Sequence, residues 1–142
     1  MWSVRRHREV EVIQITSKAD LNRAVATAAF CPEPPLSKRR AIHGSGAWRF
    51  IPGQLNGTAF AGHWEPAKFA TEPAASYALR YKMRERGYTW AITARHADFF
   101  CHFWRGYKEE WIEFGGTEHI ASALATLRAL GVEFKLVEGW DK

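Results

Sequence analysis

The chain has 142 residues and a formal net charge of +5; 46% of its residues are hydrophobic and 25% are charged. This length fits one domain, and the apolar content excludes global disorder. No apolar run approaches the roughly 18 residues that span a bilayer, and no apolar segment follows the basic N-terminus, so we expect no membrane segment and no secretory signal.

The N-terminal third predicts a strand followed by a helix. Residues 9–15 contain four β-branched side chains, which favour a strand. Ser17 is typical of a helix N-cap, and Asp20 three residues later fits a capping box. Apolar residues then recur at helical spacing until Pro32 ends the helix.

Residues 31–71 contain no long periodic pattern, and we predict an irregular middle segment there. Two short apolar runs, 47–51 and 58–61, flank the turn-rich residues 52–57. These runs favour a hairpin within the irregular segment.

The C-terminal half shows the clearest periodicity. A helix capped by Thr71, with Pro73 in its first turn, is predicted to end before Gly87. A second helix is predicted between Thr117, its cap, and Gly131, a left-handed C-cap. The strands predicted around these helices are 88–94, 99–105, 108–114 and 132–137.

Alternation divides the strand 99–105 into two faces. Phe100, His102 and Trp104 lie on one face, whereas Cys101 and Phe103 lie on the other. Both faces carry aromatic side chains, so we expect at least one of them to be core.

The order of elements predicts a single α+β domain over residues 1–142. It has a mainly antiparallel sheet of about five strands, two to three helices and the long irregular segment 31–71. A helix between the last two strands allows one parallel pairing.

Signals for catalysis and metal binding are weak. His96, Asp98 and His102 are close in sequence, but alternation turns Cys101 to the opposite face, and no tetrahedral ligand spacing results. Residues 63–65, His-Trp-Glu, match half of the zinc deaminase signature, but the cysteine half is missing. We therefore expect no metal, no cofactor and no catalytic residue. Two cysteines are too few for a disulfide framework, which favours a reduced, cytoplasmic protein.

One alternative is an enzyme. The sequences Ala41-Ile42-His43-Gly44-Ser45 and Phe69-Ala70-Thr71, followed by a helix containing Tyr77-Ala78, resemble ADP-ribosyltransferase-type folds. The resemblance implies an NAD site in which His43 and Ser45 lie by the nicotinamide riboside. Tyr77 would line the pocket, and Glu110 or Glu113 would take the acidic role. Ser45 replaces the threonine usual in this family.

The leading interpretation is a small non-enzymatic binding protein. Seven tryptophans are many for this length, and rigid aromatics with arginine dominate binding surfaces. Residues 1–50 hold nine Lys/Arg and four Asp/Glu, whereas residues 101–142 hold five and seven, which predicts a polarised surface. We expect a nucleic acid, a nucleoprotein complex or a protein partner. The candidate contact residues are Arg5, Arg6, Arg8, Lys38, Arg39, Arg40, Trp48, Trp64, Arg80, Arg84 and Trp104.

Overall fold

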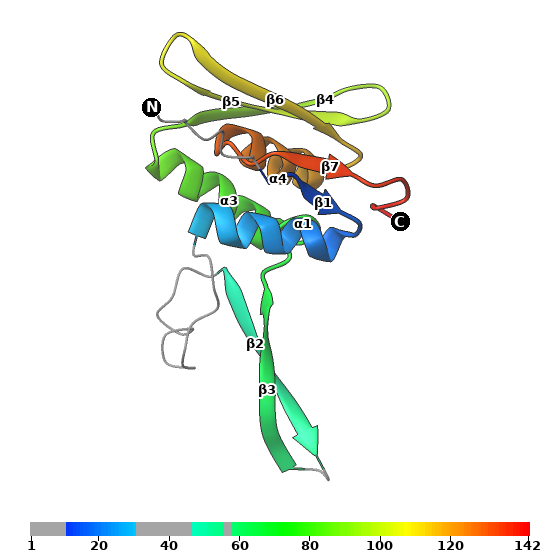
Figure 1. Ribbon diagram of the computed structural model, residues 1–142. Helices are drawn as coiled ribbons and strands as arrows, with labels where there is room; N and C mark the ends of the chain where they lie inside the picture. Colours follow the sequence, from blue (N-terminus) through cyan, green and yellow to red (C-terminus); the bar gives the residue numbers. More distant parts are fainter. Residues whose placement is uncertain (1–10, 31–46, 56–57) are drawn as a thin grey trace, which may run out of the picture.

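The computed structural model describes residues 11–30, 47–55 and 58–142, and it confirms the α+β class (Figure 1). In these ranges the chain forms three α-helices and seven mostly antiparallel strands. The strands form three small sheets rather than the single sheet expected from the sequence. No helix in the described ranges is long and apolar enough to cross a membrane.

The N-terminal elements are β1 (Ile13–Ile15), α1 (Lys18–Val25) and a π-helical turn, η1 (Ala26–Phe30). Ser17 is the N-cap of α1, as predicted, and its Oγ accepts a hydrogen bond from the Asp20 amide at 3.2 Å. The Asp20 carboxylate also accepts from the Thr16 amide at 2.9 Å. Hydrogen bonds from Thr16 lower the pKa of Asp20.

The middle of the chain is more ordered than the sequence predicts. Strands β2 (Trp48–Leu55) and β3 (Thr58–Pro66) form the expected hairpin, but it is longer than the runs 47–51 and 58–61. The hairpin therefore occupies much of the second half of the segment 31–71, and residues 31–46 lie outside the described residues. The register shifts between Ile51 and Gly53, where Pro52 has no amide hydrogen to donate. The hairpin projects away from the other elements (Figure 1).

The remaining elements are α3 (Pro73–Glu85), β4 (Thr89–Ala94), β5 (Phe99–Arg105), β6 (Glu109–Gly115), α4 (Glu118–Ala129) and β7 (Phe134–Leu136). Thr117 caps α4 as predicted, because its Oγ1 accepts from the Ile120 amide at 3.1 Å. Gly131 ends α4 with a φ of 78°, the left-handed conformation expected of it. The N-cap of α3 is Glu72 rather than Thr71.

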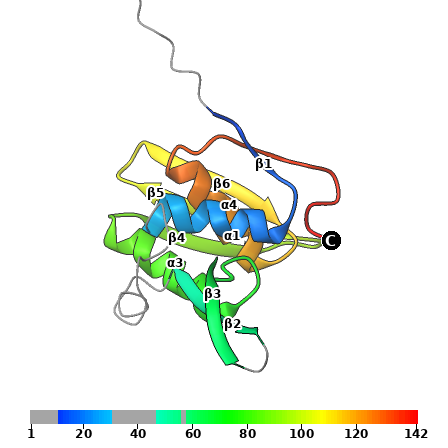
Figure 2. The ribbon, with the colours of Figure 1, turned by 60° about the horizontal axis from the view of Figure 1, so that its bottom comes forward.

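Helix α4 lies at the centre of the fold. It lies between the antiparallel sheet β4–β5–β6 and helix α1, whereas α3 packs beside it and also contacts β4 (Figures 1 and 2). The larger apolar side chains of α4, including Leu124 and Leu127, join the core cluster shared with α1. Its small side chains Ala121, Ala125 and Ala129 join a second cluster with the inner face of the sheet. One side of α4 therefore packs against the sheet, and its other side packs against the cluster that contains α1.

The first and last strands pair although almost the whole chain separates them. β1 and β7 run parallel, with Ile13 opposite Phe134 and Ile15 opposite Leu136. The sequence allowed a parallel pairing at the helix between the last two strands, but the parallel partner of β7 is β1 and not β6. This pairing fixes the N-terminal strand beside α4.

Gly115, at the end of β6, provides a test of how closely the sheet approaches α4. A Cβ at Gly115 would lie 2.6 Å from the Ala121 amide nitrogen and 2.7 Å from a side-chain carbon of Ile120. We expect Gly115→Ala to lower the free energy of unfolding by about 1–3 kcal/mol, the usual cost of overpacking. Chemical denaturation measures this loss, and Gly116→Ala is the matched control because its Cβ meets nothing. Equal stability of the two variants would contradict this packing.

Cys101 offers a second test, because it is fully buried beneath the sheet. Burial raises the pKa of its thiol to about 11, so the reactive thiolate is disfavoured in the folded protein. In a Cys31→Ser variant, we expect iodoacetamide at mildly alkaline pH to spare Cys101 in native buffer and to label it fully in guanidinium chloride. Mass spectrometry detects the label. Native labelling as fast as that of a free thiol would show that Cys101 is accessible.

Candidate functional site

The outer face of the β4–β5–β6 sheet carries a group of neighbouring aromatic side chains. Strand alternation directs Cys101 and Phe103 of β5 into the core, whereas Phe100, His102 and Trp104 lie on the face away from α4. Antiparallel register places Phe114 of β6 directly opposite Phe100. No described helix or strand covers this face (Figure 1).

The aromatic side chains of this face contact one another in two pairs. The ring centroids of Phe100 and Phe114 lie 5.8 Å apart, and those of His102 and Trp104 lie 4.8 Å apart. Phe114 is 45% exposed and Ile112, opposite His102, is 44% exposed. We name this set the aromatic sheet face: Phe100, His102, Trp104, Ile112 and Phe114.

Charged groups of both signs border the aromatic sheet face, so its net charge is small. The Arg95 guanidinium lies 4.7 Å above the Phe114 ring centroid, and its Nε donates to Asp98 at 2.7 Å. Glu110 Oε2 lies 3.1 Å from His102 Nε2. Each carboxylate here therefore has a cationic or hydrogen-bonding partner, and Arg95 presents a positive group beside an exposed ring.

Nearby, Arg105 ends β5 and is paired along the chain. Its Nη2 donates to Glu109 at 3.0 Å, and this hydrogen bond raises the pKa of Arg105. The Arg105 guanidinium also lies 4.9 Å from the Tyr88 ring centroid. Arg105 is thus held by its own neighbours at the end of the sheet.

The three predicted stacking tryptophans have different environments. Trp48 is only 5% exposed and belongs to the main core cluster, so the expectation of an exposed stacking residue is wrong there. Trp64 is partly buried against the same cluster. Trp104 lies on the aromatic sheet face, on the opposite side of α4 from that cluster's helices. Its ring centroid lies 4.8 Å from that of His102.

The predicted basic residues do not form one described surface. Arg80 is 8% exposed and lies inside the domain, so placing it on the contact surface was wrong. Arg84, one turn further along α3, is exposed. The other six lie outside the described residues: Arg5, Arg6, Arg8, Lys38, Arg39 and Arg40.

The residues implied by the ADP-ribosyltransferase resemblance are not brought together where they are described. Tyr77 is exposed on α3, on the inner side of the sheet, whereas Glu110 lies on the outer face beside His102. Glu113 faces inward, and its Oε2 accepts from Arg128 Nε at 2.9 Å. His43 and Ser45 lie outside the described residues.

Other polar groups show no compact ligand set. On β3, His63 Nε2 lies 2.9 Å from Glu65 Oε1, and this hydrogen bond lowers the pKa of Glu65. Within the ranges that the structure describes, no three His, Cys, Asp or Glu side chains are grouped so that they would hold a metal ion.

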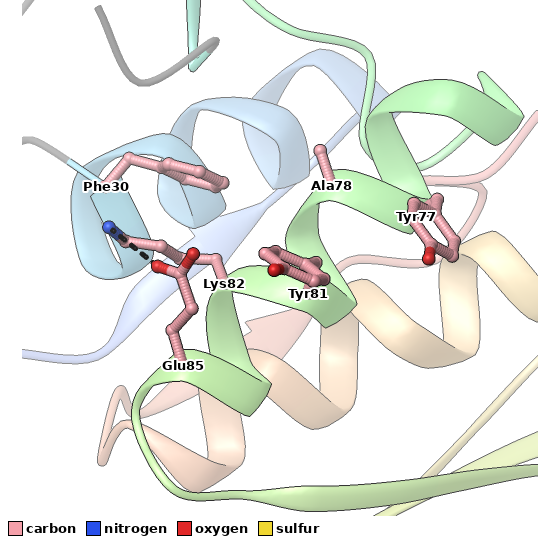
Figure 3. A pocket seen from close by; sticks show the side chains of 6 residues that line it. All are labelled: Phe30, Tyr77, Ala78, Tyr81, Lys82 and Glu85. Carbon is pink, nitrogen blue, oxygen red and sulfur yellow. Dashed lines mark ion pairs between the residues drawn. The ribbon is translucent and has the colours of Figure 1, made fainter.

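A pocket of about 490 Å³ lies beside α3 (Figure 3). Phe30 reaches over it from η1, while Tyr77 and Tyr81 share the α3 face expected from their spacing. Lys82 Nζ lies 3.9 Å from Glu85 and 5.9 Å from the Phe30 ring centroid. The Lys82 charge is therefore already compensated, and the pocket offers mainly apolar contacts.

Sequence reasoning found only part of the aromatic sheet face. It placed Phe100 and His102 on one face with Trp104 but selected only Trp104, and it missed Phe114 and Arg95. The available signal was the alternation of Glu110, Ile112 and Phe114 along the next strand. If that strand is paired antiparallel with residues 99–105 across the turn at 106–108, Phe114 lies opposite Phe100 and Ile112 lies opposite His102.

Comparison of the chain with protein-family models, with curated proteins and with solved structures finds no match. The candidate site is therefore interpreted from its own geometry and chemistry.

Proposed function

We propose that this is a non-enzymatic protein that binds single-stranded nucleic acid on the aromatic sheet face. One observation carries the proposal: aromatic rings lie side by side on a sheet face that no described element covers. Unpaired bases stack on such rings with little sequence preference, because every base has an aromatic face.

The arrangement of the rings suits more than one base. Phe100 and Phe114 are neighbours across two strands, and His102 and Trp104 are neighbours along one strand. The two pairs provide two stacking positions on one continuous sheet surface. Arg95, above Phe114, adds a cation beside a stacking position, where it can contact a phosphate or a base.

The charge distribution supports an anionic ligand. Residues 1–10 and 31–46 carry six of the 20 Lys/Arg side chains but only two of the 15 carboxylates. These cations supply the attraction to phosphates that the nearly balanced sheet face lacks. The proposed division of roles is stacking by the sheet and electrostatic attraction by the basic segments.

Phe114→Ala tests the stacking role directly. We expect it to weaken binding of a fluorescent single-stranded oligonucleotide by about 1–3 kcal/mol, the usual contribution of one aromatic–base stack. Fluorescence anisotropy of the full-length protein measures the Kd. Tyr107→Ala is the matched control, because Tyr107 is a fully exposed aromatic residue in the neighbouring turn.

Three outcomes would contradict the proposal. The first is that Phe114→Ala and Tyr107→Ala bind the oligonucleotide as the wild type does. The second is that no oligonucleotide binds at all, while the Phe114 substitution abolishes association with another protein. The third is release of nicotinamide from NAD by the purified protein, which would support the enzymatic alternative.

A triple substitution in residues 31–46 tests the proposed electrostatic attraction to phosphates. Changing Lys38, Arg39 and Arg40 together to Ala should reduce the slope of log affinity against log salt by about 0.7 for each lost phosphate contact with a single strand. The anisotropy titration is repeated at several salt concentrations, and thermal unfolding checks that the fold is retained. An unchanged slope would mean that these three cations do not contact the ligand.

A further inference from the structure

Arg80 is the most buried cation of the described residues, and it lies where α3, α4 and β4 meet. Its side chain is 8% exposed, and its Nη1 donates to Ser76 Oγ at 2.7 Å and to Ser122 Oγ at 3.2 Å. The guanidinium carbon lies 5.0 Å from the ring centroid of Trp90 on β4. Two neutral hydroxyls and one aromatic ring thus surround a full positive charge.

The hydrogen-bonding capacity of Arg80 is only partly used by the described residues. Its Nε is buried and has no acceptor among them, and its Nη2 donates to none of them. In an arginine, Nε and Nη2 form the edge that pairs with both oxygens of a carboxylate or phosphate. One complete bidentate edge of Arg80 is therefore available.

The charge of Arg80 is also uncompensated. No carboxylate of the described residues lies within ion-pair distance of it, although Arg49, Arg95, Arg105 and Arg128 each have one. An arginine cannot shed its charge when buried, and an unpaired buried charge is costly. The nearby thiol of Cys101 supplies no anion, because burial raises its pKa to about 11. These facts together call for an anion that the described residues do not supply.

A pocket borders the Trp90 side chain that lies over Arg80, although Arg80 itself does not line it. It has a volume of about 340 Å³ and is lined by Arg84, Tyr88, Thr89 and Trp90. Trp90 therefore forms a wall of the pocket and also covers the Arg80 guanidinium. Arg84 follows Arg80 by one helical turn and forms no ion pair with any residue that the structure describes.

We propose that Arg80 and Arg84 form a phosphate-binding site at the junction of α3 and the edge strand β4. Two adjacent cations without carboxylate partners fit the two negative charges of a phosphate monoester better than the single charge of a carboxylate. Phosphate oxygens accept from the Nε–Nη2 edge of Arg80 after the Trp90 indole moves aside, and Arg84 contacts the group at the mouth of the pocket.

This site is separate from the aromatic sheet face, although Thr89 belongs to both neighbourhoods: it lines the pocket and lies opposite Trp104 in the sheet. The phosphate group could be free, as in inorganic phosphate or a mononucleotide, or part of a nucleic-acid backbone. Both sources offer terminal phosphate oxygens to Arg80, but a backbone diester carries one negative charge where a monoester carries up to two, so titrations with each source distinguish them.

The first measurement is thermal unfolding of the full chain in sodium phosphate and in sodium chloride of equal ionic strength. We expect phosphate to raise Tm in a saturable way, because a ligand that binds the folded state stabilises it. Arg84→Ala should weaken the apparent phosphate affinity about tenfold, the loss of one charge-assisted contact. Lys135→Ala, an exposed cation on β7, is the control with the same change of charge and should bind as the wild type does.

The second measurement follows Arg80 itself in the wild-type protein. The Nε–H signal of Arg80 in an NMR spectrum, assigned by its loss in Arg80→Lys, should shift as inorganic phosphate is added. Sodium acetate should leave it in place. A mononucleotide and a single-stranded oligonucleotide are then titrated: tighter binding of the oligonucleotide assigns the site to a nucleic-acid backbone, and equal affinities assign it to a single phosphate group.

Two results would overturn the phosphate site. One is the absence of saturable stabilisation beyond that of chloride together with an immobile Arg80 signal. The other is an equal response to acetate, which would make the ligand a carboxylate. Neither depends on the stacking function, because Phe114→Ala removes nothing from this pocket and should leave the phosphate titration unchanged.

Discussion

The fold depends on one helix with two different apolar sides. The small side chains Ala121 and Ala125 of α4 let the inner face of the sheet pack closely, and Gly115 permits the nearest approach. On the other side, Leu124 and Leu127 fill the space between α4 and the remaining elements. A bulky residue on the alanine side would separate the sheet from the helix, because well-packed interiors have no spare volume.

This central position of α4 decides which surfaces remain open. The helix covers the inner face of the three-stranded sheet, and no described element covers the outer face. Apolar side chains such as Phe114 and Ile112 therefore remain exposed although they lie in regular strands. Exposed aromatic groups of this kind mark binding surfaces more often than isolated apolar residues do, which is why the proposed function is placed there.

The arginines of the described residues differ in burial and in the partners of their guanidinium groups. Arg95 and Arg128, both nearer the surface, have carboxylate partners at 2.7 and 2.9 Å. Arg80 lies deeper and has only the hydroxyls of Ser76 and Ser122. Exposed ion pairs contribute little to stability, whereas a buried cation without a carboxylate partner lowers stability considerably. The contrast points to Arg80 as a residue whose anionic partner lies outside the described residues.

The sequence by itself determined the features that depend on neighbouring residues: the helix caps Ser17 and Thr117, the left-handed Gly131 and the alternation of β5. These arise from backbone hydrogen bonds and side-chain spacing within a few residues. It did not reveal that Arg80 is buried, that β1 pairs with β7, or that the row containing Phe100 is the uncovered face of the sheet. Only the tertiary structure decided these, because burial and strand pairing depend on what distant segments place against a residue, and an alternating pattern with aromatics on both faces fits either orientation equally well.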